Sequence, residues 1–97
     1  MSYLLFIRKR AENQITEAYK WYEEKQPGLG TSFVECFQSS LHLIQSNPFL
    51  YPKKYKNIRS TTIQRFPYGV FYIVEKQLIS VIAVLHLSRN PQLWQNA

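Results

Sequence analysis

The chain has 97 residues, a formal net charge of +6 and 45% hydrophobic residues. This length and apolar content predict one folded domain spanning residues 1–97, and they exclude a disordered basic tail. No apolar run approaches the length of about 20 residues that spans a bilayer, and the N-terminus has no signal-peptide pattern. We therefore expect a cytoplasmic protein whose positive charge favours an anionic partner.

The first half of the chain predicts a strand and two helices. Tyr3–Ile7 is a short apolar run, which predicts a strand buried on both faces. From Ala11 onward, apolar residues recur at helical spacing until Gln26–Gly30, where proline and glycine break the pattern. A second helical pattern then runs to Asn47-Pro48. Two helices joined by a short turn predict an antiparallel hairpin with its apolar stripes facing a sheet.

Two features of the second helix lead to further expectations. Ser32 and Glu35 have the spacing of a capping box at its start, although Pro27 in a first turn is an alternative. Cys36 is the only cysteine, which excludes an internal disulfide framework and fits a reducing cytosol. Because Cys36 lies in the apolar pattern, we expect a buried structural thiol.

The second half of the chain predicts β-structure. Ile58–Phe66, Val70–Glu75 and Leu78–His86 have strand composition, and the short segments between them suit hairpin connections. The order β-α-α-β-β-β, with helices first and strands afterwards, predicts an α+β fold. Its two layers would be an antiparallel sheet and, packed on it, the helical hairpin with the N-terminal strand.

A basic segment covers the loop and first strand of this second half. No Asp or Glu lies between Glu35 and Glu75. Arg59 and Arg65 fall on one face of the predicted strand, and guanidinium groups can grip phosphate with two hydrogen bonds. Ahead of them, a predicted loop carries lysines that can supply charge toward a nucleic-acid backbone: Lys53, Lys54 and Lys56. The alternative reading of each is a solvated surface cation.

A second group of candidates surrounds the end of the last strand. His86 is the only plausible general acid or base, and Arg89 follows closely enough to hold a phosphate beside it. Tyr68, in a predicted turn, is free to orient a substrate or stack on a base, whereas Tyr72 alternates with valines and belongs to the core. A half-buried structural role is an equal alternative for His86. The chain offers no carboxylate pair, Gly-rich phosphate loop or Ser/His/Asp set, so we expect no metal and no cofactor.

A series of short motifs along nearly the whole chain resembles the RelE/ParE toxin superfamily, the toxins of bacterial type II toxin–antitoxin modules. The pieces are Ala18-Tyr-Lys-Trp-Tyr22, Pro27-Gly-Leu-Gly30 with Phe33, Asn47-Pro48 with Tyr51-Pro52, Ile58-Arg59, Arg65-Phe-Pro-Tyr68, Tyr72 and His86-x-x-Arg89-x-Pro91. The resemblance implies the same two-layer fold and a cognate antitoxin that wraps the toxin.

The resemblance leaves the target open between two classes. RelE-like toxins cut mRNA on the ribosome, which would make Arg59, Arg65 and Arg89 phosphate-neutralising groups and His86 the acid or base of a metal-independent endoribonuclease. ParE-like toxins share the fold without that catalytic set and inhibit DNA gyrase. The tail carries Trp94 where a RelE-like tail tends to place a tyrosine, and His86-x-x-Arg89 looks at least as ParE-like. A degenerate toxin kept for antitoxin binding is a third reading. We take mRNA cleavage as the first expectation and gyrase inhibition as the alternative.

Overall fold

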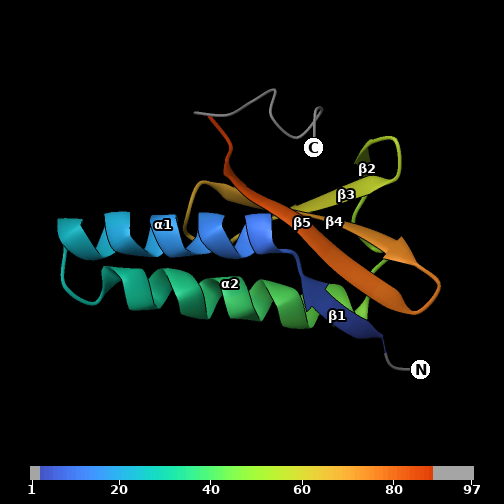
Figure 1. Cartoon of the computed structure of the whole chain (residues 1–97), viewed down its shortest axis with the longest axis horizontal. Helices are drawn as coiled ribbons and strands as arrows, with labels where there is room; N and C mark the ends of the chain where they lie inside the picture. The colour runs from blue at the N-terminus through green and yellow to red at the C-terminus, as the bar shows by residue number, and fades with distance from the viewer. Residues whose placement is uncertain (1–2, 89–97) are drawn as a thin grey trace.

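The computed structural model describes residues 3–88, and it confirms an α+β fold with the expected order of elements (Figure 1). One further short strand, β2, occupies what the sequence predicted as a lysine-bearing loop. The elements are β1 (Leu4–Ile7), α1 (Lys9–Lys25), α2 (Leu29–Ser46), β2 (Lys53–Tyr55), β3 (Ile58–Thr62), β4 (Tyr68–Glu75) and β5 (Leu78–His86).

The five strands form one sheet in the order β1-β5-β4-β3-β2. β3 to β5 make the expected antiparallel meander, and β2 extends it at one edge. β1 joins at the other edge by pairing parallel with β5, Leu5 opposite Ile79. The sheet is therefore mixed. Parallel pairing requires a long crossover between the two strands, which the rest of the chain supplies.

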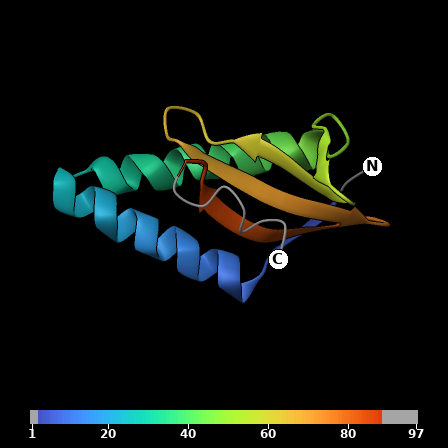
Figure 2. The same cartoon turned by 90° about the horizontal axis from the view of Figure 1, so that it is seen from above.

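The prediction that β1 is buried on both faces is wrong. Leu4 and Phe6 are 73% and 57% exposed, whereas the alternate residues Leu5 and Ile7 pack against the main core. β1 is an edge strand that is covered only on the helix side, because both helices lie on that face of the sheet (Figures 1 and 2).

The antiparallel helical hairpin is confirmed, but α2 begins differently from either predicted start. Gly28 is its N-cap in the left-handed region, with φ of 88°, and no side chain of a capping box bonds there. Instead, the Glu23 carboxylate of α1 accepts the backbone N–H groups of Gly28 at 2.9 Å and Gly30 at 3.0 Å. A carboxylate suits the positive end of a helix dipole. One helix therefore caps the other.

The main core lies between the hairpin and the sheet. Its buried members from the helices are Ala11, Ala18, Tyr22, Phe33, Phe37 and Ile44. The sheet contributes Tyr68, Val70 and Tyr72 of β4 and Ile79, Val81 and Val84 of β5. Cys36 is only half-buried at the edge of this layer, so the expectation of a buried thiol is wrong. A smaller apolar cluster lies on the opposite face and includes Ile58, Phe71 and Ile82.

The predicted strand Ile58–Phe66 is shorter in the structure. β3 ends at Thr62, and residues 63–67 form a turn in which the Ile63 N–H donates to the Tyr68 carbonyl at 2.8 Å. The next strand accordingly begins at Tyr68, two residues before its predicted start. This change moves Arg65 from a strand into a turn and Tyr68 from a turn into a strand.

Candidate functional site

Arg59 lies near the start of β3 and faces the helix-covered side of the sheet, opposite the fully buried Tyr72 of β4. Its Nη1 donates to the Tyr51 carbonyl at 2.7 Å, and its guanidinium lies 5.1 Å from the centre of the Phe49 ring. Arg59 therefore ties down the connection between α2 and β2. Because the Arg59 side chain is half-buried and already engaged in these contacts, it is not available as a free phosphate-binding group.

Tyr72 also holds the connection between α2 and β2 in place. Its hydroxyl donates to the Pro48 carbonyl at 2.8 Å, a buried hydrogen bond. Burial raises the pKa of Tyr72 to about 12, and the positive charge of Arg59 partly offsets this rise. The prediction that Tyr72 belongs to the core is confirmed.

The three lysines lie at the same end of β3. Lys53 and Lys54 belong to the edge strand β2, where Lys53 pairs with Arg59, and Lys56 occupies the following turn with φ of 51°. All three are exposed. The Lys56 ammonium lies 5.3 Å from the centre of the Tyr55 ring. These lysines can attract an anion. The prediction that all three lie in a loop is wrong, because Lys53 and Lys54 belong to the strand β2.

Arg65 lies at the far end of β3, in the turn of residues 63–67. It is exposed and has φ of 72°, a left-handed conformation that is costly for a residue with a β-carbon. Its Nη2 lies 3.6 Å from the Cys36 sulfur on α2, a weak contact for a guanidinium. The Arg65 side chain is thus exposed and only weakly held by its neighbours.

His86 ends β5 beside that turn and is partly buried. Its Nδ1 accepts the backbone N–H of Ser88 at 3.2 Å, which places the proton of the neutral ring on Nε2. The ring meets Tyr68 edge to face at a centroid distance of 5.2 Å. His86 is therefore packed and oriented by its neighbours, as the structural reading of this residue anticipated.

Tyr68 is not the freer turn residue that the sequence suggested. It is 7% exposed, and its ring packs on Phe33 at 5.2 Å and Tyr22 at 6.1 Å. Phe66 completes this aromatic cluster, with its centroid 4.9 Å from that of Tyr22. In this arrangement neither ring face of Tyr68 is presented for stacking on a base.

The predicted residues thus divide between two ends of the sheet. Tyr72, opposite Arg59, and Tyr68, opposite His86, are four positions apart on β4, which corresponds to roughly 13 Å along a strand. Arg65 and His86 share the second end, since the Leu87 N–H donates to the Pro67 carbonyl at 2.9 Å. Arg89 and Trp94 lie outside the described residues.

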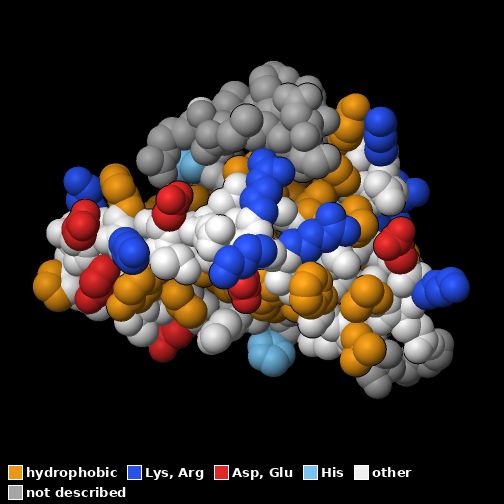
Figure 3. Space-filling model, viewed as in Figure 1, with side chains coloured by type: hydrophobic (Ala, Val, Ile, Leu, Met, Phe, Trp, Pro, Cys, Tyr) orange, Lys and Arg blue, Asp and Glu red, His pale blue; other side chains and the backbone are white. Residues whose placement is uncertain are grey.

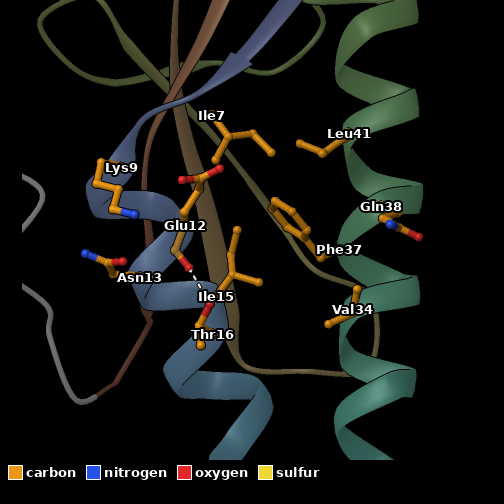
Figure 4. Close-up of a pocket in the computed structure, with 10 residues that line it drawn as sticks. All are labelled: Ile7, Lys9, Glu12, Asn13, Ile15, Thr16, Val34, Phe37, Gln38 and Leu41. Atoms are coloured by element: carbon orange, nitrogen blue, oxygen red, sulfur yellow. Dashed lines mark hydrogen bonds between the residues drawn. The ribbon is translucent and has the colours of Figure 1, made fainter.

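Two of the hollows formed by residues 3–88 are larger than about 300 Å³. One, of about 390 Å³, lies between the start of α1 and the middle of α2, with Ile15, Phe37 and Leu41 pointing into it and Lys9 and Glu12 beside them (Figure 4). The other, of about 320 Å³, is lined by Arg8, Arg10, Asn57, Ile58, Ile73 and Ile82. Within residues 3–88, no group of three or more His, Cys, Asp or Glu side chains is placed to bind a metal ion.

The sequence analysis did not single out Arg8 and Arg10. The signal for them is the basic run Arg8-Lys9-Arg10, which directly follows the predicted first strand. The structure places both arginines beside apolar side chains of three strands. Among the helices of residues 3–88, none is long and apolar enough to cross a membrane.

Comparison with known proteins identifies the family. No protein with a curated description matches the sequence. Among solved structures, a chain of the chromosomal ParDE toxin–antitoxin system from P. aeruginosa superposes with a TM-score of 0.78 at 16% identity, covering 87% of this chain and 95% of that one. This likeness shows the fold. The family model of the ParE toxin of the type II toxin–antitoxin system parDE matches residues 5–91. The chain belongs to the ParE toxin family, within the RelE/ParE superfamily.

Proposed function

We propose that this chain is a toxin that inhibits DNA gyrase by binding it, without catalysis, and that a cognate antitoxin neutralises it. The observation that carries the proposal is the separation of the candidate catalytic residues. Arg59 is engaged with Tyr51 and Phe49 at one end of the sheet, while Arg65 and His86 lie at the other. Phosphate cleavage needs its charged groups and its acid or base around one scissile bond.

The membership of the ParE family supports the same choice over mRNA cleavage. mRNA cleavage on the ribosome, the first expectation from the sequence, is the second candidate. The observation in its favour is that the turn of Arg65 is hydrogen-bonded to the chain just after His86. Arg65 and His86 offer one cation and one imidazole, but Tyr68, the tyrosine that packs on His86, is buried in the aromatic cluster.

Electrostatics gives the exposed lysines a binding role in this proposal. Lys53, Lys54 and Lys56 project from an edge of the protein whose net charge is +6, where they can speed the approach to an acidic surface. The same charge suits an acidic antitoxin that folds on binding. A topoisomerase target also implies a cytoplasmic location.

Two assays on the purified protein test the proposal. We expect it to inhibit supercoiling by gyrase and to leave a translated message uncut in a toeprinting assay with a filled ribosomal A site. The double variant Arg65→Ala/His86→Ala should inhibit supercoiling as well as the unaltered chain. Cleavage of the message that disappears in this variant, with supercoiling unaffected by either protein, would reject gyrase inhibition in favour of mRNA cleavage.

A matched pair of variants separates charge from site. Lys53→Gln/Lys54→Gln/Lys56→Gln should raise the concentration needed for half inhibition several-fold at low salt and have little effect at high salt. Lys9→Gln/Lys20→Gln/Lys25→Gln on α1 removes the same charge elsewhere and serves as the control. An equal loss in both would show that net charge, rather than the β2 edge, attracts the target.

A further inference from the structure

The smaller hollow lies on the sheet face that the helices do not cover. Its floor consists of one isoleucine from each of three adjacent strands: Ile58 of β3, Ile73 of β4 and Ile82 of β5. Ile58, Ile73 and Ile82 belong to the second apolar cluster, on the face opposite the main core. In Figure 2, no helix lies in front of the strands, so the described helices leave this face of the sheet uncovered. A volume of about 320 Å³ is at the low end for ligand pockets.

Arg8 and Arg10 form one wall of this hollow. Both are exposed, and neither makes an ion pair with another residue in the described part of the chain. Figure 3 shows basic side chains gathered over the start of α1 and the adjoining strands, with hydrophobic side chains beside them. Two guanidinium groups without carboxylate partners beside an aliphatic floor are complementary to a ligand that is both acidic and aliphatic.

The stability of α1 does not explain these arginines. The N-terminal end of a helix carries partial positive charge, so cations there are unfavourable by a few tenths of a kcal/mol or more each. Arg8 is nevertheless the N-cap of α1 and has no side-chain cap bond, while Arg10 lies in its first turn. Glu12 is the single acidic residue of that turn. The basic charge at this position therefore opposes local helix stability.

We propose that this hollow docks an acidic, aliphatic peptide segment of the antitoxin. An aliphatic side chain of the segment packs on the half-buried Ile73 and on the small accessible parts of Ile58 and Ile82, which are 7% and 8% exposed. Carboxylates next to it pair with Arg8 and Arg10. Nucleic acid fits less well, since single strands are held by aromatic stacking and by polar contacts to base edges, which an isoleucine floor does not provide. The inference rests on the proposed function only in taking the partner to be an antitoxin.

The test uses the full chain with methyl-labelled isoleucine and three acetylated peptide amides. The acidic, aliphatic probe is Glu-Leu-Asp-Leu-Glu, and its controls are Gln-Leu-Asn-Leu-Gln and Glu-Ser-Asp-Ser-Glu. We expect the first peptide to shift the methyl resonances of Ile58, Ile73 and Ile82. The methyls of Ile63 and Ile79, which belong to the main core, should stay in place. Each control peptide should bind at least tenfold more weakly.

Variants of the chain test separately the contributions of the two arginines and of the isoleucines to peptide binding. Arg8→Gln/Arg10→Gln should weaken binding of the acidic peptide by at least tenfold, and Ile73→Thr by several-fold. Lys20→Gln/Lys25→Gln removes equal charge toward the other end of α1 and should change the affinity less than twofold. Thermal melting of each variant verifies that it is folded.

Three results would overturn the docking site. They are equal binding of the uncharged peptide, equal shifts across all isoleucines, and a short oligothymidylate that moves the same methyls and loses affinity in Arg8→Gln/Arg10→Gln. A chain that inhibits gyrase but does not bind the acidic peptide rejects the docking site alone. One that binds the peptide but leaves gyrase active rejects the target alone.

Discussion

Arg59 near the start of β3 and Arg65 in the turn after it are equivalent in the sequence pattern, but their surroundings in the structure differ. Arg59 is half-buried and bonded to the Tyr51 carbonyl, so its charge serves the connection that follows α2. Arg65 is exposed in a left-handed turn, and within residues 3–88 its side chain has one weak hydrogen bond, to the Cys36 sulfur. The comparison teaches that a basic segment can combine a structural cation with an exposed, weakly held one.

The largest expected effect is at the structural end. Arg59→Ala leaves the Tyr51 carbonyl without its charged donor and removes the contact with Phe49. We expect the free energy of unfolding to fall by about 2–3 kcal/mol, measured by urea denaturation. Arg59→Lys, which keeps the charge but not the planar fork, should recover part of this loss. An Arg59→Ala protein as stable as the unaltered chain would remove the basis for calling Arg59 structural.

A smaller effect is expected for its neighbour in the same region. Tyr72→Phe deletes the hydroxyl that donates to Pro48 and should lower the unfolding free energy by about 1–2 kcal/mol. Phenylalanine keeps the buried ring, so the variant isolates the hydrogen bond. Urea denaturation at neutral pH measures the difference. No change in stability would mean that water replaces the tyrosine hydroxyl at the Pro48 carbonyl.

The pKa of Tyr72 gives a matching pH dependence. Its folded pKa is raised to about 12 from 10.0, so the folded state favours the neutral phenol. This contribution to stability is complete below pH 10 and is lost as the pH rises from about 10 to about 12. We expect Tyr72→Phe to lack that component of alkaline unfolding. Identical alkaline unfolding curves for the two proteins would contradict it.

The smallest expected effect on stability is at the exposed end. Arg65→Ala should change the unfolding free energy by no more than about 0.5 kcal/mol, because the side chain is exposed and its contact is weak. Arg65→Gly should be more stable than Arg65→Ala by about 0.5–1 kcal/mol, since glycine relieves the positive φ. A loss of about 2 kcal/mol in Arg65→Ala would make the two arginines structurally alike after all.

Much of the fold could be predicted because its signals are local. The helical spacing that includes Ala18 and Tyr22, and the alternation that buries Tyr72, follow from one face of each element meeting the core. The candidate site could be predicted less well. Alternation places Arg59 and Thr61 on one face of a strand, but it does not say which face the helices cover or where the strand ends.

The sequence by itself determined the helical hairpin, the order of the elements along the chain and the excess of positive charge, because periodicity and composition act over neighbouring residues. Only the tertiary structure decided that β1 is a parallel edge strand, that Glu23 caps α2, and that Arg59 and Arg65 lie at opposite ends of β3. These outcomes depend on contacts between residues distant in the chain. Contacts of this kind also place Arg8 and Arg10 beside isoleucines of three strands. The basic run at the start of α1 therefore suggests a binding partner only when the folded structure is known.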